Sequence, residues 1–133
     1  MKRAITVALS TIATAAGMTT VALPAQAAPA GCPGGSFCVY LNTGYTGGHY
    51  YASGNDTNWN NDNFSGTTIS VGNDDSAWFN NGFHDGTTPD YVKVYDYREM
   101  QGRMTICLRY GTGFPSKAAS NDDGESHTWA YGC

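Results

Sequence analysis

The sequence predicts an all-β domain, folded as a sandwich or barrel and stapled by two disulfides. Short runs of β-branched and aromatic residues alternate with clusters of Gly, Asn, Asp and Ser, and no long stretch has the period of an amphipathic helix. Four cysteines all lie beyond residue 30, and an even number in a short exported chain favours disulfide bonds. These covalent links would reinforce a domain too small to bury a large core.

Residues 1–27 have the three-part pattern of a secretory signal peptide. Two basic residues follow the initial Met, an uncharged run rich in apolar and small residues spans 4–23, and Ala-Gln-Ala at 25–27 forms a small-x-small cleavage site. Serine, threonine and glycine dilute the run, so it is less apolar than the stretch of about 20 residues that spans a membrane. We therefore expect a secreted, extracellular protein with one domain over residues 28–133.

Without this signal peptide the chain is strongly acidic. The whole sequence has 7 Lys and Arg against 11 Asp and Glu, a net charge of −4, and removal of the two basic residues near the start takes this to −6. Such a domain would be repelled by nucleic acids and by anionic lipids. We expect neither nucleic acid nor membrane as a partner, and we expect a monomer.

The predicted strands are short and separated by turns. In order, they span residues 37–41, 49–52, 67–71, 77–79, 91–95, 104–108 and 128–131. The alternation is clear over 91–95, where Val92 and Val94 share one face and the residues around them share the other. The polar segments 53–66 and 80–88 are predicted loops. Many short strands with frequent turns are typical of β-sandwiches and barrels.

The spacing of the cysteines favours one of the three possible pairings. Cys32 and Cys38 are close in sequence, and the Pro-Gly-Gly segment between them can turn the chain. This pairing leaves Cys107 to bond Cys133 and to hold the end of the chain. The chain-entropy model assigns roughly 3.5 kcal/mol to the longer loop and roughly 2.4 kcal/mol to the shorter one. A zinc site is the weaker alternative, because no Cys-x-x-Cys or His-x-x-x-His spacing exists.

A pattern of large side chains and glycine occurs twice. An aromatic residue is followed five positions later by a second large side chain and, two positions after that, by glycine: Tyr40, Tyr45 and Gly47, then Tyr95, Met100 and Gly102. This spacing indicates a strand that folds over in a hairpin, with the second side chain covering the first and glycine in a conformation that other residues resist. An acidic turn follows each unit, at 72–77 and 122–127, so we expect two pseudo-symmetric units.

These motifs resemble those of known families. The hairpins and acidic turns resemble the Greek-key signature of βγ-crystallins. The segments 32–40 and 73–82 resemble the start and the centre of the Streptomyces metalloproteinase inhibitor family, which shares that fold. The resemblance implies a βγ-crystallin-like double Greek-key sandwich with a peptidase-inhibitor role. In that family a second disulfide closes a short, exposed loop implicated in blocking proteases; here Cys107 and Cys133 are far apart, so that loop is missing or rebuilt.

The resemblance also implies a calcium site shared by the two acidic turns. Asn73 and Ser76 would contribute from the first turn, and Asp123 and Ser126 from the second. Ca²⁺ takes six to eight oxygen ligands, and extracellular modules bind it with a Kd of about 10⁻⁴–10⁻³ M. The alternative is that these turns are simply solvated, because Asn and Asp favour turns through their side-chain hydrogen bonds. We expect no obligatory cofactor and, at most, calcium.

Nothing in the sequence indicates catalysis. The three histidines are scattered, and neither a Gly-x-Ser-x-Gly elbow nor a His-Glu-x-x-His motif occurs. We therefore expect no catalytic residues and no enzyme.

The candidate binding residues lie in loops. A protease inhibitor presents a rigid loop, and rigidity lowers the ordering cost of binding. The candidate loops are 80–90 and 110–123; the second carries Tyr110 and Phe114, with Arg109 just before it.

Trp59, among amide residues, either faces a carbohydrate or protein surface or folds back over the hairpin. The sequence thus predicts a small, secreted, peptidase-inhibitor-like protein that binds an extracellular protease. The alternatives are a calcium-binding structural module and a protein that binds carbohydrate or a cell-wall polymer.

Overall fold

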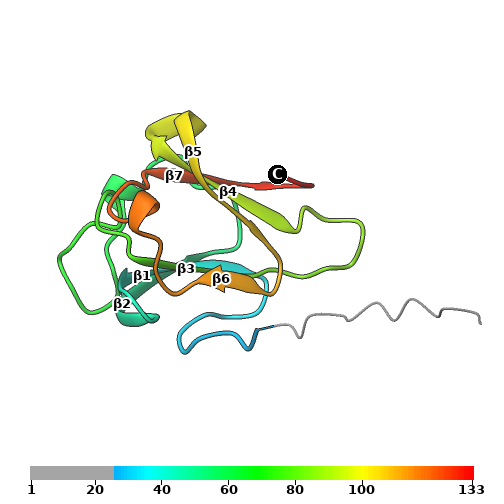
Figure 1. Ribbon diagram of the computed structural model, residues 1–133, viewed down its shortest axis with the longest axis horizontal. Helices are drawn as coiled ribbons and strands as arrows, with labels where there is room; N and C mark the ends of the chain where they lie inside the picture. Colours follow the sequence, from blue (N-terminus) through cyan, green and yellow to red (C-terminus); the bar gives the residue numbers. More distant parts are fainter. Residues whose placement is uncertain (1–25) are drawn as a thin grey trace, which may run out of the picture.

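Two antiparallel sheets form the two layers of the computed structural model, which describes residues 26–133 (Figure 1). The first sheet has the strand order β2 (Thr46–Ala52), β1 (Ser36–Asn42), β3 (Ala77–Asn81), β6 (Thr112–Phe114). The second has the order β5 (Gln101–Arg109), β4 (Tyr91–Tyr97), β7 (Ser126–Ala130). The predicted signal peptide lies almost wholly outside the described residues. Because β6 comes from the second half of the chain but pairs with β3, the two halves are interlocked across the layers.

Most predicted strands are confirmed, with two differences. The segment 67–71 is not a strand: Ser70 makes only an isolated bridge to Asn63, while Val71 is fully buried within the turn-rich connection from β2 to β3. β6 was not predicted, because three residues that include a glycine carry no periodic signal. Three short 3₁₀ turns complete the structure: η1 (Trp59–Asn61), η2 (Arg98–Met100) and η3 (Ala118–Ser120).

The core lies between the sheets and follows from the alternation of the strands. Val92 and Val94 of β4 are fully buried, as are Phe37 and Val39 of β1, so the inward faces of the two layers meet. Full burial of such a side chain stabilises the fold by about 1.5–3 kcal/mol. A second, smaller cluster lies on the reverse side of the first sheet, around Tyr40.

The repeated pattern is confirmed in the backbone. Tyr45 and Gly47 have φ of 60° and 75°, and their counterparts Met100 and Gly102 have φ of 55° and 75°. The Tyr45 ring meets Tyr40 edge-on, with the ring centroids 5.4 Å apart, so the second side chain of the unit covers the first. The spacing in the sequence therefore reports a hairpin geometry that occurs twice.

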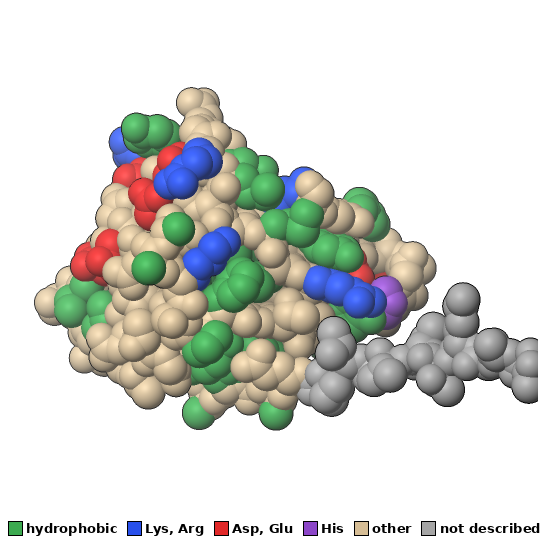
Figure 2. All heavy atoms as spheres, viewed as in Figure 1, with side chains coloured by type: hydrophobic (Ala, Val, Ile, Leu, Met, Phe, Trp, Pro, Cys, Tyr) green, Lys and Arg blue, Asp and Glu red, His purple; other side chains and the backbone are tan. Residues whose placement is uncertain are grey.

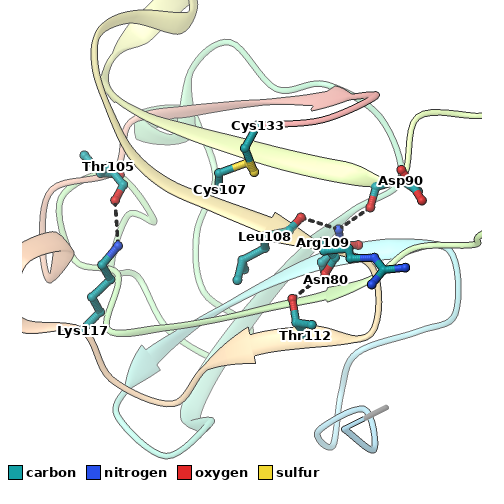
Figure 3. The surroundings of a disulfide bond; sticks show 9 residues. All are labelled: Asn80, Asp90, Thr105, Cys107, Leu108, Arg109, Thr112, Lys117 and Cys133. Carbon is teal, nitrogen blue, oxygen red and sulfur yellow. Dashed lines mark hydrogen bonds between the residues drawn. A yellow bond between two sulfur atoms is a disulfide. The ribbon is translucent and has the colours of Figure 1, made fainter. Parts of the chain in front are cut away.

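Both predicted disulfides are confirmed. Cys32 bonds Cys38 across a tight turn, and Cys107 of β5 bonds Cys133 at the end of the chain (Figure 3). No free cysteine is present in the described chain. The second bond fixes the segment that follows β7 to β5, which lies on the other side of β4 in the same sheet.

Trp59 belongs to the core, so the expectation of an exposed binding residue is wrong. Its side chain is fully buried, and its Nε1 donates to Nδ1 of His127 at 2.9 Å. The His127 ring is therefore neutral with its proton on Nε2, which donates to the Gly54 carbonyl at 2.9 Å. The polar neighbours of Trp59 along the chain face outward, while the indole folds back into the sandwich and ties the loop after β2 to β7.

Candidate functional site

The loop over residues 82–90 joins β3 to β4 and projects beyond the sheets (Figure 1). Residues 83–88 are all exposed, and Phe83 at the start of the loop has 67% of its surface accessible. This loop lies within one of the two segments that the sequence indicates as candidates for protease contact. Exposure alone is ordinary for a loop. Its hydrogen bonds determine whether it is rigid enough to act as a binding loop.

The base of the loop is clamped by Asn80. This side chain is fully buried; its Oδ1 accepts from Gly82 N at 2.9 Å, and its Nδ2 donates to the Asp90 carbonyl at 3.0 Å and to the Leu108 carbonyl at 2.9 Å (Figure 3). One amide thus joins both ends of the loop to β5 in the opposite sheet. Because the bonds are buried, loss of one would leave an unpaired polar group in the core.

Side chains inside the loop fix its tip. Asp85 Oδ1 accepts from the backbone N–H and hydroxyl groups of both Thr87 and Thr88, at 2.8–3.0 Å. These bonds to the charged form hold the pKa of Asp85 well below its usual range. The His84 ring donates from Nδ1 to Asp90 Oδ2 at 2.6 Å and stacks on Tyr110, with the ring centroids 4.0 Å apart. The loop is therefore exposed and internally rigid.

Both disulfide-closed segments contact this loop. On one side, Asn81 Nδ2 donates to the Cys32 carbonyl at 3.0 Å, and Gly35 N donates to the Asn81 carbonyl at 2.8 Å. The Phe83 ring lies over Gly35 so closely that a Cβ there would come within 2.6 Å of the ring. On the other side, the Tyr131 hydroxyl donates to the Thr87 carbonyl at 3.4 Å.

Two of the predicted binding residues lie beside this loop. Arg109 packs 4.6 Å from the centroid of the Tyr110 ring and donates to its hydroxyl at 2.9 Å, and Tyr110 in turn stacks on His84. Figure 2 shows a basic side chain next to a histidine on this face. Phe114 is separate: it lies in β6, half-buried against the core, with Lys117 Nζ 4.9 Å from its centroid. Binding by these three residues stays a prediction.

The two acidic turns lie side by side, as the repeat predicts. Asn73 N donates to the Gly124 carbonyl at 2.9 Å, and Asn73 Nδ2 donates to Glu125 at 2.7 Å. Asp75 is buried between the turns, where its carboxylate accepts from Gly124 N at 3.0 Å and from Trp78 Nε1 at 2.7 Å. Burial raises the pKa of Asp75 to about 6 despite these two bonds.

Three of the four predicted calcium ligands, Asn73, Asp123 and Ser126, already have protein partners for their side chains. Asp123 forms an ion pair with Arg103, and the Ser126 hydroxyl donates to the Tyr97 carbonyl at 2.7 Å and accepts from Met100 N at 3.1 Å. Ser76 is nearly buried. Within residues 26–133, no three His, Cys, Asp or Glu side chains are grouped to hold a metal ion. The residues fit calcium poorly in this arrangement, and its binding stays a prediction.

The histidines do not share an environment. His49 bonds the Ser65 hydroxyl at 3.1 Å, His84 bonds Asp90, and His127 is buried against Trp59. In the described part of the chain no carboxylate hydrogen-bonds the His49 ring, so the His49–Ser65 pair lacks the acid that orients a catalytic histidine.

Sequence reasoning missed the residues that build the loop. Asp85, followed after one glycine by two threonines, is a local signal for a side-chain-stabilised turn, and it could have been found. Asn80 and Phe83 carry no such signal, because the role of each depends on segments far away in the chain.

Solved βγ-crystallin domains share the fold. A structure concerned with the evolution of the eye-lens βγ-crystallin domain fold has a TM-score of 0.56 at 16% identity, covering 76% of this chain and 91% of its own. A βγ-crystallin from Ciona intestinalis has a TM-score of 0.53 at 12% identity, covering 71% and 99%. One from an archaeon has a TM-score of 0.51 at 14% identity, covering 73% and 99%. These likenesses establish the βγ-crystallin-like sandwich.

Sequence comparison points to one family. Residues 25–107 match the model of peptidase inhibitor family I36. This segment includes the first disulfide, Asn80 and the whole loop over 82–90. No curated protein is significantly similar to the chain.

Proposed function

Since the chain belongs to peptidase inhibitor family I36, we propose that it is a secreted inhibitor that blocks an extracellular peptidase with the loop over residues 82–90. The observation that carries this proposal is the clamped loop: its tip is exposed, while Asn80 and Asp85 hold its base and its turn. Both disulfides and the expected signal peptide suit an extracellular site of action.

Rigidity is what such a loop contributes to affinity. A flexible loop loses about 0.5–1.5 kcal/mol for each rotamer-rich side chain that becomes ordered on binding. In this loop Asp85 and His84 are already held by hydrogen bonds in the free protein. A clamped loop also resists the separation of its ends, so a peptidase that attacked it would release it slowly.

Phe83 is the side chain that we propose enters the specificity pocket of the peptidase. The loop over 82–90 contains no Lys or Arg, and its charged groups, Asp85 and Asp90, are engaged by other loop residues. Phe83 is largely exposed, and Gly35 supports its ring from below. The target would therefore be a peptidase with an apolar pocket, and a metalloproteinase is the class that the sequence resemblance favours.

A panel of peptidases tests the proposal. The secreted protein should inhibit thermolysin-like or subtilisin-like peptidases and spare trypsin-like ones, which require a basic residue. Phe83→Ala should weaken inhibition about 100-fold, as expected for a buried aromatic anchor worth about 2–3 kcal/mol. Tyr97→Ala is the matched control, because Tyr97 is a similarly exposed aromatic residue at the η2 hairpin. An absence of inhibition at tens of micromolar protein would end the proposal.

We further propose that the inhibitor acts as a monomer without nucleic-acid or lipid partners, since its acidity repels both. Among residues 26–133 there is no helix with the length and apolar character needed to cross a membrane.

A further inference from the structure

A cleft of about 520 Å³ opens between the loop over 82–90 and the segment 53–55. Its volume is within the range of about 300–1,000 Å³ that is usual for small-ligand sites. Three apolar and three polar residues give it its chemical character: Phe83, Pro89 and Trp129, and Ser53, Asn55 and Thr88. Trp129 comes from β7, so the cleft lies where both sheets contribute to one end of the sandwich.

The Trp129 ring is fixed before any ligand arrives. Its Nε1 donates to the Gly54 carbonyl at 3.1 Å, and its backbone N donates to Asn55 Oδ1 at 2.8 Å. A Cβ on Gly82 would lie 2.6 Å from the indole, so the absence of a side chain at Gly82 lets the ring lie against the loop. With Phe83 supported on Gly35, the cleft has two aromatic surfaces in set positions, which reduces the ordering cost of binding.

Two of the polar residues of the cleft, Asn55 and Ser53, have groups that can bond a ligand. Asn55 uses its Oδ1 to hold Trp129, which leaves its amide nitrogen as a donor. Ser53 also lines the cleft and supplies a hydroxyl group. No charged side chain lines the cleft. A ligand that fits must therefore be uncharged, must have an apolar face for the rings, and must have hydroxyl or amide groups for the rim.

We propose that this cleft binds a neutral saccharide, a short stretch of pyranose units from a polymer outside the cell. The C–H groups on one face of a pyranose ring pack against indole or phenyl rings, and its hydroxyls pair with amide and hydroxyl groups. A purely apolar ligand would leave Ser53 and Asn55 unpaired, which costs affinity. An ionised ligand would find no opposite charge in the cleft.

Tryptophan fluorescence provides a direct test. Trp59 and Trp78 are fully buried, so Trp129 is the accessible tryptophan of residues 26–133. Titration of the full-length secreted protein with β-1,4-linked N-acetylglucosamine oligomers and with β-1,4-linked glucose oligomers should give a saturable change with one of them. The sugar that binds then identifies the polymer. No change with either series at about 10 mM would overturn the proposal.

A variant of Trp129 and a chemical probe of its indole test whether the saccharide binds in this cleft. By calorimetry, Trp129→Ala should lose at least 10-fold in saccharide affinity, and Tyr97→Ala should retain it. In the wild-type protein, bound saccharide should slow the oxidation of Trp129 by N-bromosuccinimide, a measurement that needs no variant. Binding that survives Trp129→Ala, or oxidation at an unchanged rate in the presence of bound sugar, would place the ligand elsewhere and refute the proposal. Peptidase inhibition without sugar is measured separately, so the two proposals can fail independently.

Discussion

Acidification should change the free energy of unfolding in opposite directions through two buried groups, His127 and Asp75. His127 is neutral and buried, and burial lowers its pKa from 6.5 to about 4. As the pH falls below 6.5, the unfolded chain binds a proton that the folded protein excludes, so the free energy of unfolding decreases. At 1.36 kcal/mol per pKa unit, the full effect is about 3 kcal/mol, complete below pH 4.

Asp75 acts in the opposite direction. Burial raises its pKa from 3.8 to about 6, so above pH 6 the folded protein carries the cost of a buried charge. As the pH falls from 6 to 3.8, the folded protein gains a proton before the unfolded chain does, and stability rises by about 3 kcal/mol. In the wild-type protein the two effects nearly cancel, and we expect a net change below about 1 kcal/mol between pH 7 and 4.5.

Urea unfolding at several pH values separates the two groups. His127→Gln removes the first titration, so this variant should gain about 2 kcal/mol on going from pH 7 to 4.5; Asp75→Asn removes the second, so it should lose about 2 kcal/mol. Both variants will be less stable overall, and the slope with pH is the quantity to compare. If the stability of His127→Gln and that of the wild type change by the same amount between pH 7 and 4.5, within about 0.5 kcal/mol, the assigned His127 titration is wrong.

Other changes test the clamp, the disulfides and the acidic turns. Asn80→Asp should destabilise the protein by about 2–4 kcal/mol in urea unfolding. The variant loses the two buried hydrogen bonds that Nδ2 donates, and it places a carboxylate oxygen next to the carbonyl oxygens that accepted them. A loss below about 1 kcal/mol would contradict the role of Asn80 as a clamp. Replacing Cys107 and Cys133 by Ser should lower the free energy of unfolding by about 3–4 kcal/mol in the same urea experiment. An unchanged free energy of unfolding would show that this bond does not stabilise the protein. Arg103→Ala should bind calcium more tightly than the wild type in calorimetry, because Asp123 is released; no heat from either would remove the calcium hypothesis.

Features that depend on neighbours along the chain could be predicted from the sequence. The alternation that buries Val92 and Val94 is a property of the strand itself. The repeated hairpin spacing predicted the left-handed backbone at Gly47 and Gly102, and the turn between Cys32 and Cys38 predicted their pairing. Each of these features involves residues a few positions apart, so a pattern in the sequence can indicate it.

Which loop residues are buried and which are exposed could not be predicted, because it depends on contacts between distant segments. Trp59 and Asn80 lie in or beside segments predicted as loops, and nothing around them distinguishes core from surface. Trp59 is buried because it meets His127, 68 residues further on, and Asn80 clamps its loop because it reaches Leu108. Burial depends on what covers a side chain, and here the cover comes from the other half of the chain, which local sequence does not specify.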